Sequence, residues 1–336
     1  MPDELPCVGS EVVRARRLFS GSRHAAARLL IDVPADVLPC KRGRACGLAD
    51  CLDSALQLCS VSPGYAELMG LTNAAFMLRV DDRLSLDSTK EDRWYRVVPV
   101  LERLGFGRAR LHAGPDATEV VEGELRGGRP LLALGWGEES RDWALICGQS
   151  ADREKWWGYH FDSRPILEEA IGACRLLLSL GPQTCEPDLA QVRRDGLSAA
   201  AILPDSQRDP IPQYHRWMEL MRSKSAIAEP QQSLSVFRRH EWMVEVLLDA
   251  RTAAADFLQM LSEDEPDEAG LLQVSDTYLQ IVDILEARDP LWYTEHGSLL
   301  LESAEERAVW AELLDEAMRM ERHALSLLSA VGGRGR

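Results

Sequence analysis

The sequence lacks an apolar run long enough to cross a membrane, and its residues 1–17 lack the apolar segment of an export signal. Basic residues are also scarce: 38 Lys and Arg stand against 54 Asp and Glu, and the formal net charge is -16. Nucleic acids and anionic membrane surfaces attract positive charge, so neither is an expected partner. These absences predict a cytoplasmic protein.

The eight cysteines lack the spacing of a metal site. Cys40, Cys46, Cys51 and Cys59 include no CxxC pair, and no HxxxH motif accompanies them. In a chain without an export signal, scattered cysteines such as Cys147 are expected to be reduced thiols. The sequence therefore predicts no metal, no cofactor and no disulfide framework.

The length of 336 residues and the apolar content of 46% predict two globular domains. Five prolines from Pro182 to Pro212 mark a linker that is flanked by short helices. The predicted division is an N-terminal segment 1–32, a first domain 33–165, the linker 166–212 and an all-α helical bundle domain 213–330.

Helical and extended patterns alternate in the first domain and predict an α+β fold. Short apolar runs between turns indicate antiparallel strands, and apolar periodicity followed by glycine indicates helices. The expected strands are Arg108–Ala113, Leu131–Trp136, Trp143–Cys147 and Trp156–Phe161, and the expected helices are Asp92–Leu104 and Ala117–Leu125. These elements predict one central helix packed on a small antiparallel sheet.

The stretch Cys46–Gly70 predicts a short central helix that begins at a thiol. Apolar residues follow Cys51 at helical spacing, and the turn Ser62–Gly64 ends the pattern. The positive end of a helix dipole stabilises a thiolate, which makes a cysteine at this position a candidate nucleophile. The alternative is that Cys51 is a buried apolar residue, like Cys59 one or two turns later.

Four motifs occur in the order found in papain-like enzymes. They are the cysteine at a helix start, the segment Tyr65–Gly70, the stretch Gly128–Pro130 before a strand, and a strand that ends at Gly148. Through them, residues 33–165 resemble the bacteriocin-processing cysteine peptidase family and its degenerate bacterial relatives, which include proteins similar to the N-terminal domain of butirosin-biosynthesis protein H. The resemblance implies a papain-like fold for this domain.

The resemblance also implies an incomplete catalytic triad. Cys51 matches the nucleophile because its distance from Tyr65–Gly70 is the one that the family pattern implies, whereas Cys46, although followed by Gly47, lies too far upstream. Asp142 stands where the family has its histidine, and Asp162 matches the third member on the next strand. The glutamine that helps to form the oxyanion hole has no counterpart in residues 41–45. An imidazole, with a pKa of about 6.5, can take up the thiol proton, whereas an aspartate is a weak base that repels a thiolate. We expect the sulfur of Cys51 to lie closer to Asp142 than any other cysteine sulfur does.

His160 offers a replacement for the missing base. It lies two residues before Asp162, so the two side chains would point to the same face of a strand. If that face lined the cleft, Cys51, His160 and Asp162 would form a rearranged triad. The alternative is a strand histidine beside Trp156 and Trp157 that has no catalytic role.

The C-terminal part predicts a bundle of amphipathic helices. Apolar residues recur at helical steps from Met243 to Leu261, from Leu272 to Leu285 and from Trp310 to Leu325, and Ser303 with Glu306 matches a capping box. Three clusters of aromatic and charged residues are candidates for a binding surface: His215–Trp217, Arg238–Trp242 and Trp292–His296. The alternative is that their tryptophans fill an interface between domains and their charges form a solvated face.

Three functions fit the sequence. The leading hypothesis is a degenerate cysteine-peptidase-like protein that acts as a binding or regulatory module for a peptide, a small acyl-type ligand or a protein partner. The second is an active cysteine hydrolase or acyltransferase in which Cys51 forms an acyl-enzyme. The third is a structural protein whose helical domain makes the contacts. The replacement of histidine by Asp142 favours the first.

Overall fold

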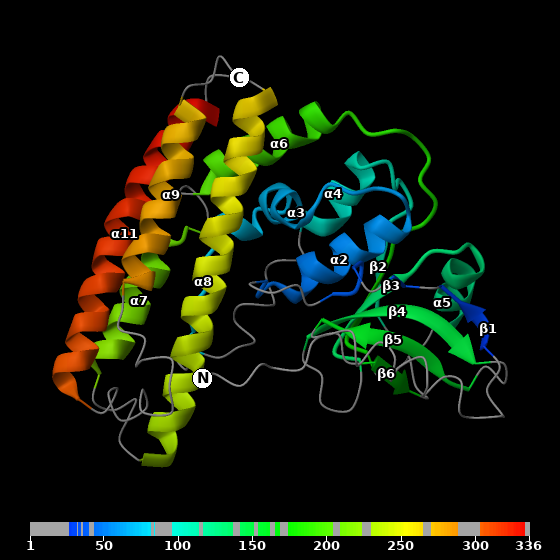
Figure 1. The fold of residues 1–336 in the computed structure, drawn as a ribbon, viewed down its shortest axis with the longest axis horizontal. Coiled ribbons are helices and arrows are strands. Elements are labelled where there is room, and N and C mark those ends of the chain that lie inside the picture. Colours follow the sequence, from blue (N-terminus) through cyan, green and yellow to red (C-terminus); the bar gives the residue numbers. More distant parts are fainter. Residues whose placement is uncertain are drawn as a thin grey trace. The chain divides into compact units, whose positions relative to one another are not determined.

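The computed structural model describes residues 27–31, 33–34, 36–39, 44–81, 84, 96–113, 117–136, 142–150, 154–161, 165–168, 174–203, 209–223, 230–264, 270–287 and 303–332. Contacts divide the chain into two compact units. The sheet unit comprises Met1–Pro63 and Leu101–Glu186, and the helical unit comprises Gly64–Val100 and Pro187–Arg336. Figure 1 shows both units, with labels on elements where there is room.

The sheet unit is built on one antiparallel sheet. Among the described residues, the strand order is β2-β7-β3-β4-β5-β6, and β1 also pairs with β4. One edge of β4 pairs with β3 over its first half and with β1 over its second half, so β4 is the centre of the sheet. The strands are β1 (Ala27–Leu30), β2 (Arg110–His112), β3 (Leu131–Leu134), β4 (Trp143–Ser150), β5 (Trp156–His160), β6 (Pro165–Glu168) and β7 (Leu176–Ser179).

Two helices, α2 (Gly47–Leu58) and α5 (Ala117–Arg126), cover opposite faces of this sheet. Every residue of β4 is buried, which requires cover on both sides. Val121 and Leu125 of α5 pack in one apolar cluster with Ala144 and Ile146. The alternate β4 residues, such as Leu145, face the other way, and α2 contacts β4 and β3 there.

The expected elements of the first domain are confirmed in the described residues. β2, β3, β4, β5 and α5 lie where the sequence pattern predicts them, and α4 (Val97–Arg103) lies within the expected helix Asp92–Leu104. β4 continues past the expected end at Cys147 because its later residues pair with β1. The mixed α+β class is therefore confirmed.

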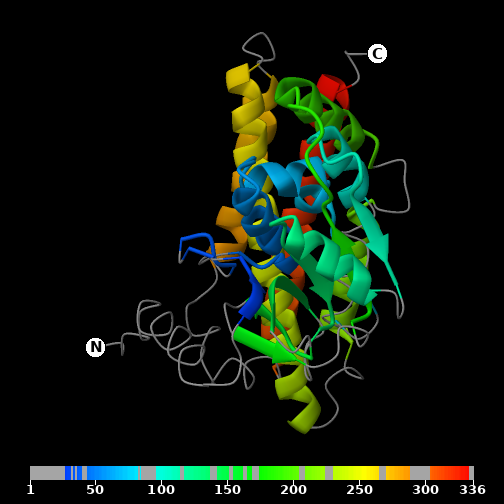
Figure 2. The ribbon, with the colours of Figure 1, turned by 90° about the vertical axis from the view of Figure 1, so that its right-hand side faces the viewer.

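The helical unit contains long helices that pack along one another. α8 contacts α9, α9 contacts α11, and α11 contacts α7, as Figures 1 and 2 also show. The elements are α3 (Tyr65–Leu71), η1 (Ala74–Phe76), α6 (Leu189–Ala201), α7 (Ile211–Arg222), α8 (Pro230–Asp264), α9 (Gly270–Glu286) and α11 (Ala304–Gly332). The predicted apolar stripes of α8, α9 and α11 include their most buried residues, such as Met243, Ile281 and Leu314. Ser303 caps α11 by accepting a hydrogen bond from the N–H of Glu306 at 3.3 Å.

The contact division differs from the predicted domain boundaries. The stretch Gly64–Val100 belongs with the helical unit, whereas the sequence pattern placed it in the domain 33–165. The reason is visible at Gly70, where an added Cβ would lie 2.2 Å from the ring of Phe257. The bare backbone of α3 thus lets α8 approach closely, and α3 also contacts α6.

Candidate functional site

The central helix begins four residues earlier than predicted, at Gly47, with Cys46 as its N-cap residue. The expectation that Cys51 starts this helix is wrong. The N–H of Asp50 donates to the carbonyl oxygen of Cys46 at 3.0 Å, which closes the first turn before Cys51 is reached. Cys51 lies in the second turn and is fully buried. The helix dipole acts mainly on groups at the terminus, so Cys46 takes the position that the sequence pattern gave to Cys51.

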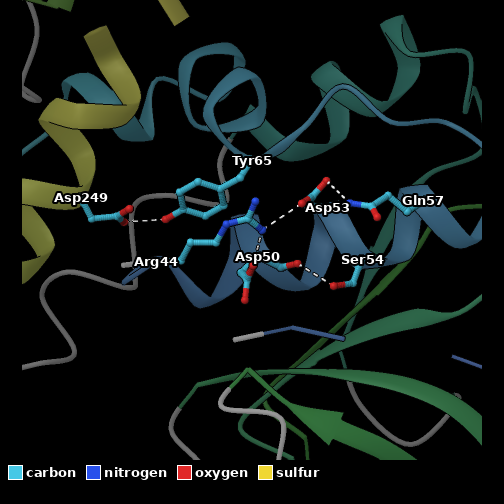
Figure 3. Close-up of polar contacts among 7 residues, drawn as sticks. All are labelled: Arg44, Asp50, Asp53, Ser54, Gln57, Tyr65 and Asp249. Atoms are coloured by element: carbon cyan, nitrogen blue, oxygen red, sulfur yellow. Dashed lines mark hydrogen bonds and ion pairs between the residues drawn. The ribbon is translucent and has the colours of Figure 1, made fainter. Parts of the chain in front are cut away.

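An ion-pair cluster explains why the helix starts there. Arg44 donates from Nη1 to Asp50 at 2.5 Å and to Asp53 at 2.9 Å (Figure 3). Both carboxylates are almost completely buried, and Gln57 donates to Asp53 at 2.8 Å. The positive end of the helix dipole also favours Asp50, which lies in the first turn. Arg44 therefore binds the residues before the helix to its first two turns.

The carboxylate of Asp142 lies against Gly47, the first residue of α2. A Cβ built on Gly47 would lie 2.5 Å from Oδ1 of Asp142 and 3.3 Å from Cβ of Phe161. The backbone thus comes so close to the carboxylate that a side chain at Gly47 would clash. Oδ1 of Asp142 also accepts a hydrogen bond from the N–H of Trp143 at 2.8 Å, which orients it at the start of β4. The helix end that faces Asp142 is therefore Cys46–Gly47.

His160 lies in β5 on the side of the sheet that α5 covers. Its Cα partner is Ala144, which belongs to the apolar cluster with α5. Gly158, two residues earlier, faces Trp136 of the same cluster, and alternation along a strand gives His160 the same side. Cys51 lies in α2, on the opposite face. By this alternation Cys51 and His160 belong to opposite faces of the sheet, and Asp162 lies outside the described residues.

Two other cysteines of the sheet unit have the properties of packing residues. Burial raises the pKa of the Cys147 thiol to about 12, and that of the Cys59 thiol to about 11. Thiols with these values stay protonated near neutral pH and are poor nucleophiles. Within the part of the chain that the structure describes, no group of three or more His, Cys, Asp and Glu residues is arranged to hold a metal ion.

Two of the three clusters in the C-terminal part contribute to the core of the helical unit. Trp217 donates from Nε1 to Nδ1 of His240 at 3.1 Å, and the ring of Trp310 stands edge-on to His240 at 4.5 Å. Burial lowers the pKa of His240 to about 3, so this imidazole is neutral near pH 7. These side chains stabilise the packing of α7, α8 and α11. The third cluster, Trp292–His296, lies outside the described residues.

No protein-family model matches the chain, and no curated protein matches it. None of the described helices combines the length and the apolar character that a membrane span needs.

Sequence reasoning rejected Cys46 with its neighbour Gly47 as the start of the site, and it gave Arg44 no role. One signal for them was present, namely the Cys46-Gly47 pair with two aspartates a helical turn apart behind it. The count from Tyr65–Gly70 outweighed that signal and moved the helix start to Cys51. In the structure, Tyr65 instead starts α3 of the helical unit, where its hydroxyl bonds to Asp249 at 2.5 Å (Figure 3).

Proposed function

We propose that this protein is a degenerate cysteine-peptidase-like binding or regulatory module whose site lies at the N-terminal end of α2. One observation carries the proposal: the carboxylate of Asp142 lies against Gly47, beside Cys46. A thiol at the N-cap of a helix, next to the start of a strand, is the arrangement that the family resemblance implies for a nucleophile and its base. The position of the base holds an aspartate.

The chemistry of this pair argues against peptidase turnover. A positioned general base contributes about 10²–10⁴-fold to the rate, and a carboxylate near neutral pH supplies little of that assistance. Cys46 and Asp142 are only 4% and 5% exposed, so a substrate carbonyl has little access to the sulfur. Non-covalent binding of a peptide or a small acyl-type ligand is the activity that remains.

Alkylation of individual thiols tests the proposal. The protein is treated with iodoacetamide at pH 7, and the rate at each cysteine is followed by mass spectrometry. Cys185 is exposed and serves as an internal reference. We expect Cys46 to react more slowly than Cys185 in the parent protein. Asp142→His should raise the rate at Cys46, because an imidazolium favours the thiolate, and Asp142→Asn should raise it less, because it only removes the negative charge.

The same experiment addresses an active cysteine hydrolase or acyltransferase. The observation that favours this second candidate is the N-cap position of Cys46, where the helix dipole stabilises an anion. An active enzyme requires Cys46 to react faster than Cys185 in the parent protein, and acyl transfer or peptide cleavage to disappear in Cys46→Ala while Cys51→Ala retains it. That combination would overturn the degenerate reading.

A further inference from the structure

The interior of the helical unit contains an ion pair that is completely buried. Nε of Arg251 donates to Oε2 of Glu321 at 2.7 Å, and both side chains have an exposed fraction of 0%. Tyr214, which is also buried, donates its hydroxyl to the same oxygen at 3.1 Å. Glu321 thus uses one carboxylate oxygen for two donors.

Arg251 also donates hydrogen bonds to backbone carbonyls in the same unit. Its Nη1 donates to the carbonyl oxygen of Ala75 at 2.7 Å and lies 3.4 Å from that of Met77. These carbonyls belong to η1 and to the residue that follows it. One guanidinium therefore neutralises Glu321 and binds the backbone of a segment far away in the sequence.

Three polar atoms of this cluster remain unmatched. Nη2 of Arg251, Oε1 of Glu321 and the hydroxyl of Tyr278 are buried and have no hydrogen-bond partner among the described residues. The guanidinium carbon of Arg251 lies 5.7 Å from the centre of the Tyr278 ring. Arg251 thus contacts both Glu321 and the ring of Tyr278. Unmatched polar atoms in the interior cost free energy, and an unmatched charged donor and acceptor cost the most.

We propose that this cluster is an internal binding site for one small hydrogen-bonding molecule of the size of water. Such a molecule accepts a hydrogen bond from Nη2 of Arg251, donates one to Oε1 of Glu321, and bonds to the hydroxyl of Tyr278. Buried waters typically make about three hydrogen bonds of this kind to polar groups that lack protein partners. Arg251, Glu321, Tyr214 and Tyr278 are all fully buried, so the described part of the chain favours a ligand no larger than water. The bound molecule completes the ion pair and so fixes Arg251 on the carbonyls of η1.

A pair of matched substitutions tests the site. Tyr278→Phe removes the hydroxyl that the bound molecule would satisfy, and Tyr214→Phe removes a hydroxyl that already has a partner within the protein. Neither substitution changes the ring, so both variants should fold. We expect each to raise the equilibrium constant for unfolding, measured with denaturant, by about fivefold. If the hydroxyl of Tyr278 is truly unmatched, Tyr278→Phe will leave that constant unchanged or lower it, and the proposal fails.

A second measurement detects the molecule itself. Magnetic relaxation dispersion of ¹⁷O-labelled water counts internal waters that exchange slowly. The count should fall by one in Tyr278→Phe relative to the parent and stay unchanged in Tyr214→Phe. A crystal structure of the parent with no density between Arg251, Glu321 and Tyr278 would overturn the proposal, whatever the stability data show.

Discussion

Each unit contains an arginine that binds buried carboxylates, but the two arginines differ in how far away their partners lie along the chain. Arg44 in the sheet unit binds Asp50 and Asp53, six and nine residues later, and its side chain is 18% exposed. Arg251 in the helical unit binds Glu321, 70 residues away, and Ala75, 176 residues away, at 0% exposure.

The difference separates a local stabilising contact from a contact that defines tertiary structure. The Arg44 cluster forms when one helix forms, because its members lie in that helix or just before it. The Arg251 cluster forms only when η1, α8 and α11 have come together. The ion pair and the hydrogen bonds offset the cost of desolvating the Arg251 and Glu321 charges only when all partners are in place. The cluster therefore favours one arrangement of the helical unit.

Arg251→Ala should produce the largest effect. It leaves Glu321 buried without a cation and releases the carbonyl of Ala75, so the helical unit should lose about 3 to 5 kcal/mol of unfolding free energy. Denaturant unfolding followed by far-ultraviolet circular dichroism measures this. The double variant Arg251→Met, Glu321→Leu should recover much of the lost unfolding free energy, because it leaves no unpaired buried charge. If the double variant is as unstable as Arg251→Ala, the unpaired charge of Glu321 is not the cause of the loss.

Acid should also destabilise the helical unit through His240. Burial lowers the pKa of His240 in the folded chain to about 3, well below the usual value of about 6.5, so the unfolded chain binds a proton that the folded chain excludes. The contribution of His240 to the free energy of unfolding is therefore fully present above pH 6.5. It decreases as the pH drops towards 3, and about 3 kcal/mol is lost at pH 4. Stability curves of the parent and of His240→Gln, measured from pH 7 to pH 4, should converge at low pH. Parallel curves would contradict the prediction.

Arg44→Ala should cost less than Arg251→Ala, about 2 kcal/mol, because Arg44 itself is partly exposed and Asp50 keeps the favourable helix dipole. The control is Arg126→Ala, which removes an exposed ion pair with Glu122 one turn away on α5 and should cost at most about 0.5 kcal/mol. Equal losses from the two substitutions, measured by denaturant unfolding of the sheet unit, would mean that the burial of Asp50 and Asp53 contributes nothing.

Apart from the Arg126→Ala control, the smallest effect is expected at the cap of α11. Ser303→Ala removes the oxygen that accepts the N–H of Glu306 and should cost about 1 kcal/mol, whereas Ser303→Asp should retain the cap. Thermal unfolding of both variants gives the comparison. If Ser303→Asp is as unstable as Ser303→Ala, the bond to Glu306 is not what stabilises this end of the helix.

The sequence alone determined the elements whose signals are local. The strands expected at Leu131–Trp136 and Trp143–Cys147, the helix expected at Ala117–Leu125 and the cap at Ser303 all follow from apolar spacing, turns or a capping pattern within about ten residues, and the structure has elements at these places. The start of the central helix was missed for a related reason. Apolar spacing continues smoothly from Gly47 to Leu58, so it does not mark at which cysteine the helix begins. In the structure the helix begins after Cys46, and Arg44 forms ion pairs with Asp50 and Asp53 in its first two turns.

Only the tertiary structure decided which residues meet. The contact between Asp142 and Gly47 depends on the packing of α2 on β4, and the side of the sheet that His160 occupies depends on the pairing of β5 with β4. The Arg251 cluster joins segments from η1 to α11, for which the sequence holds no periodic signal. Local conformation is set by neighbours along the chain, whereas pairing of distant charges is selected by burial, which exists only once the units have folded.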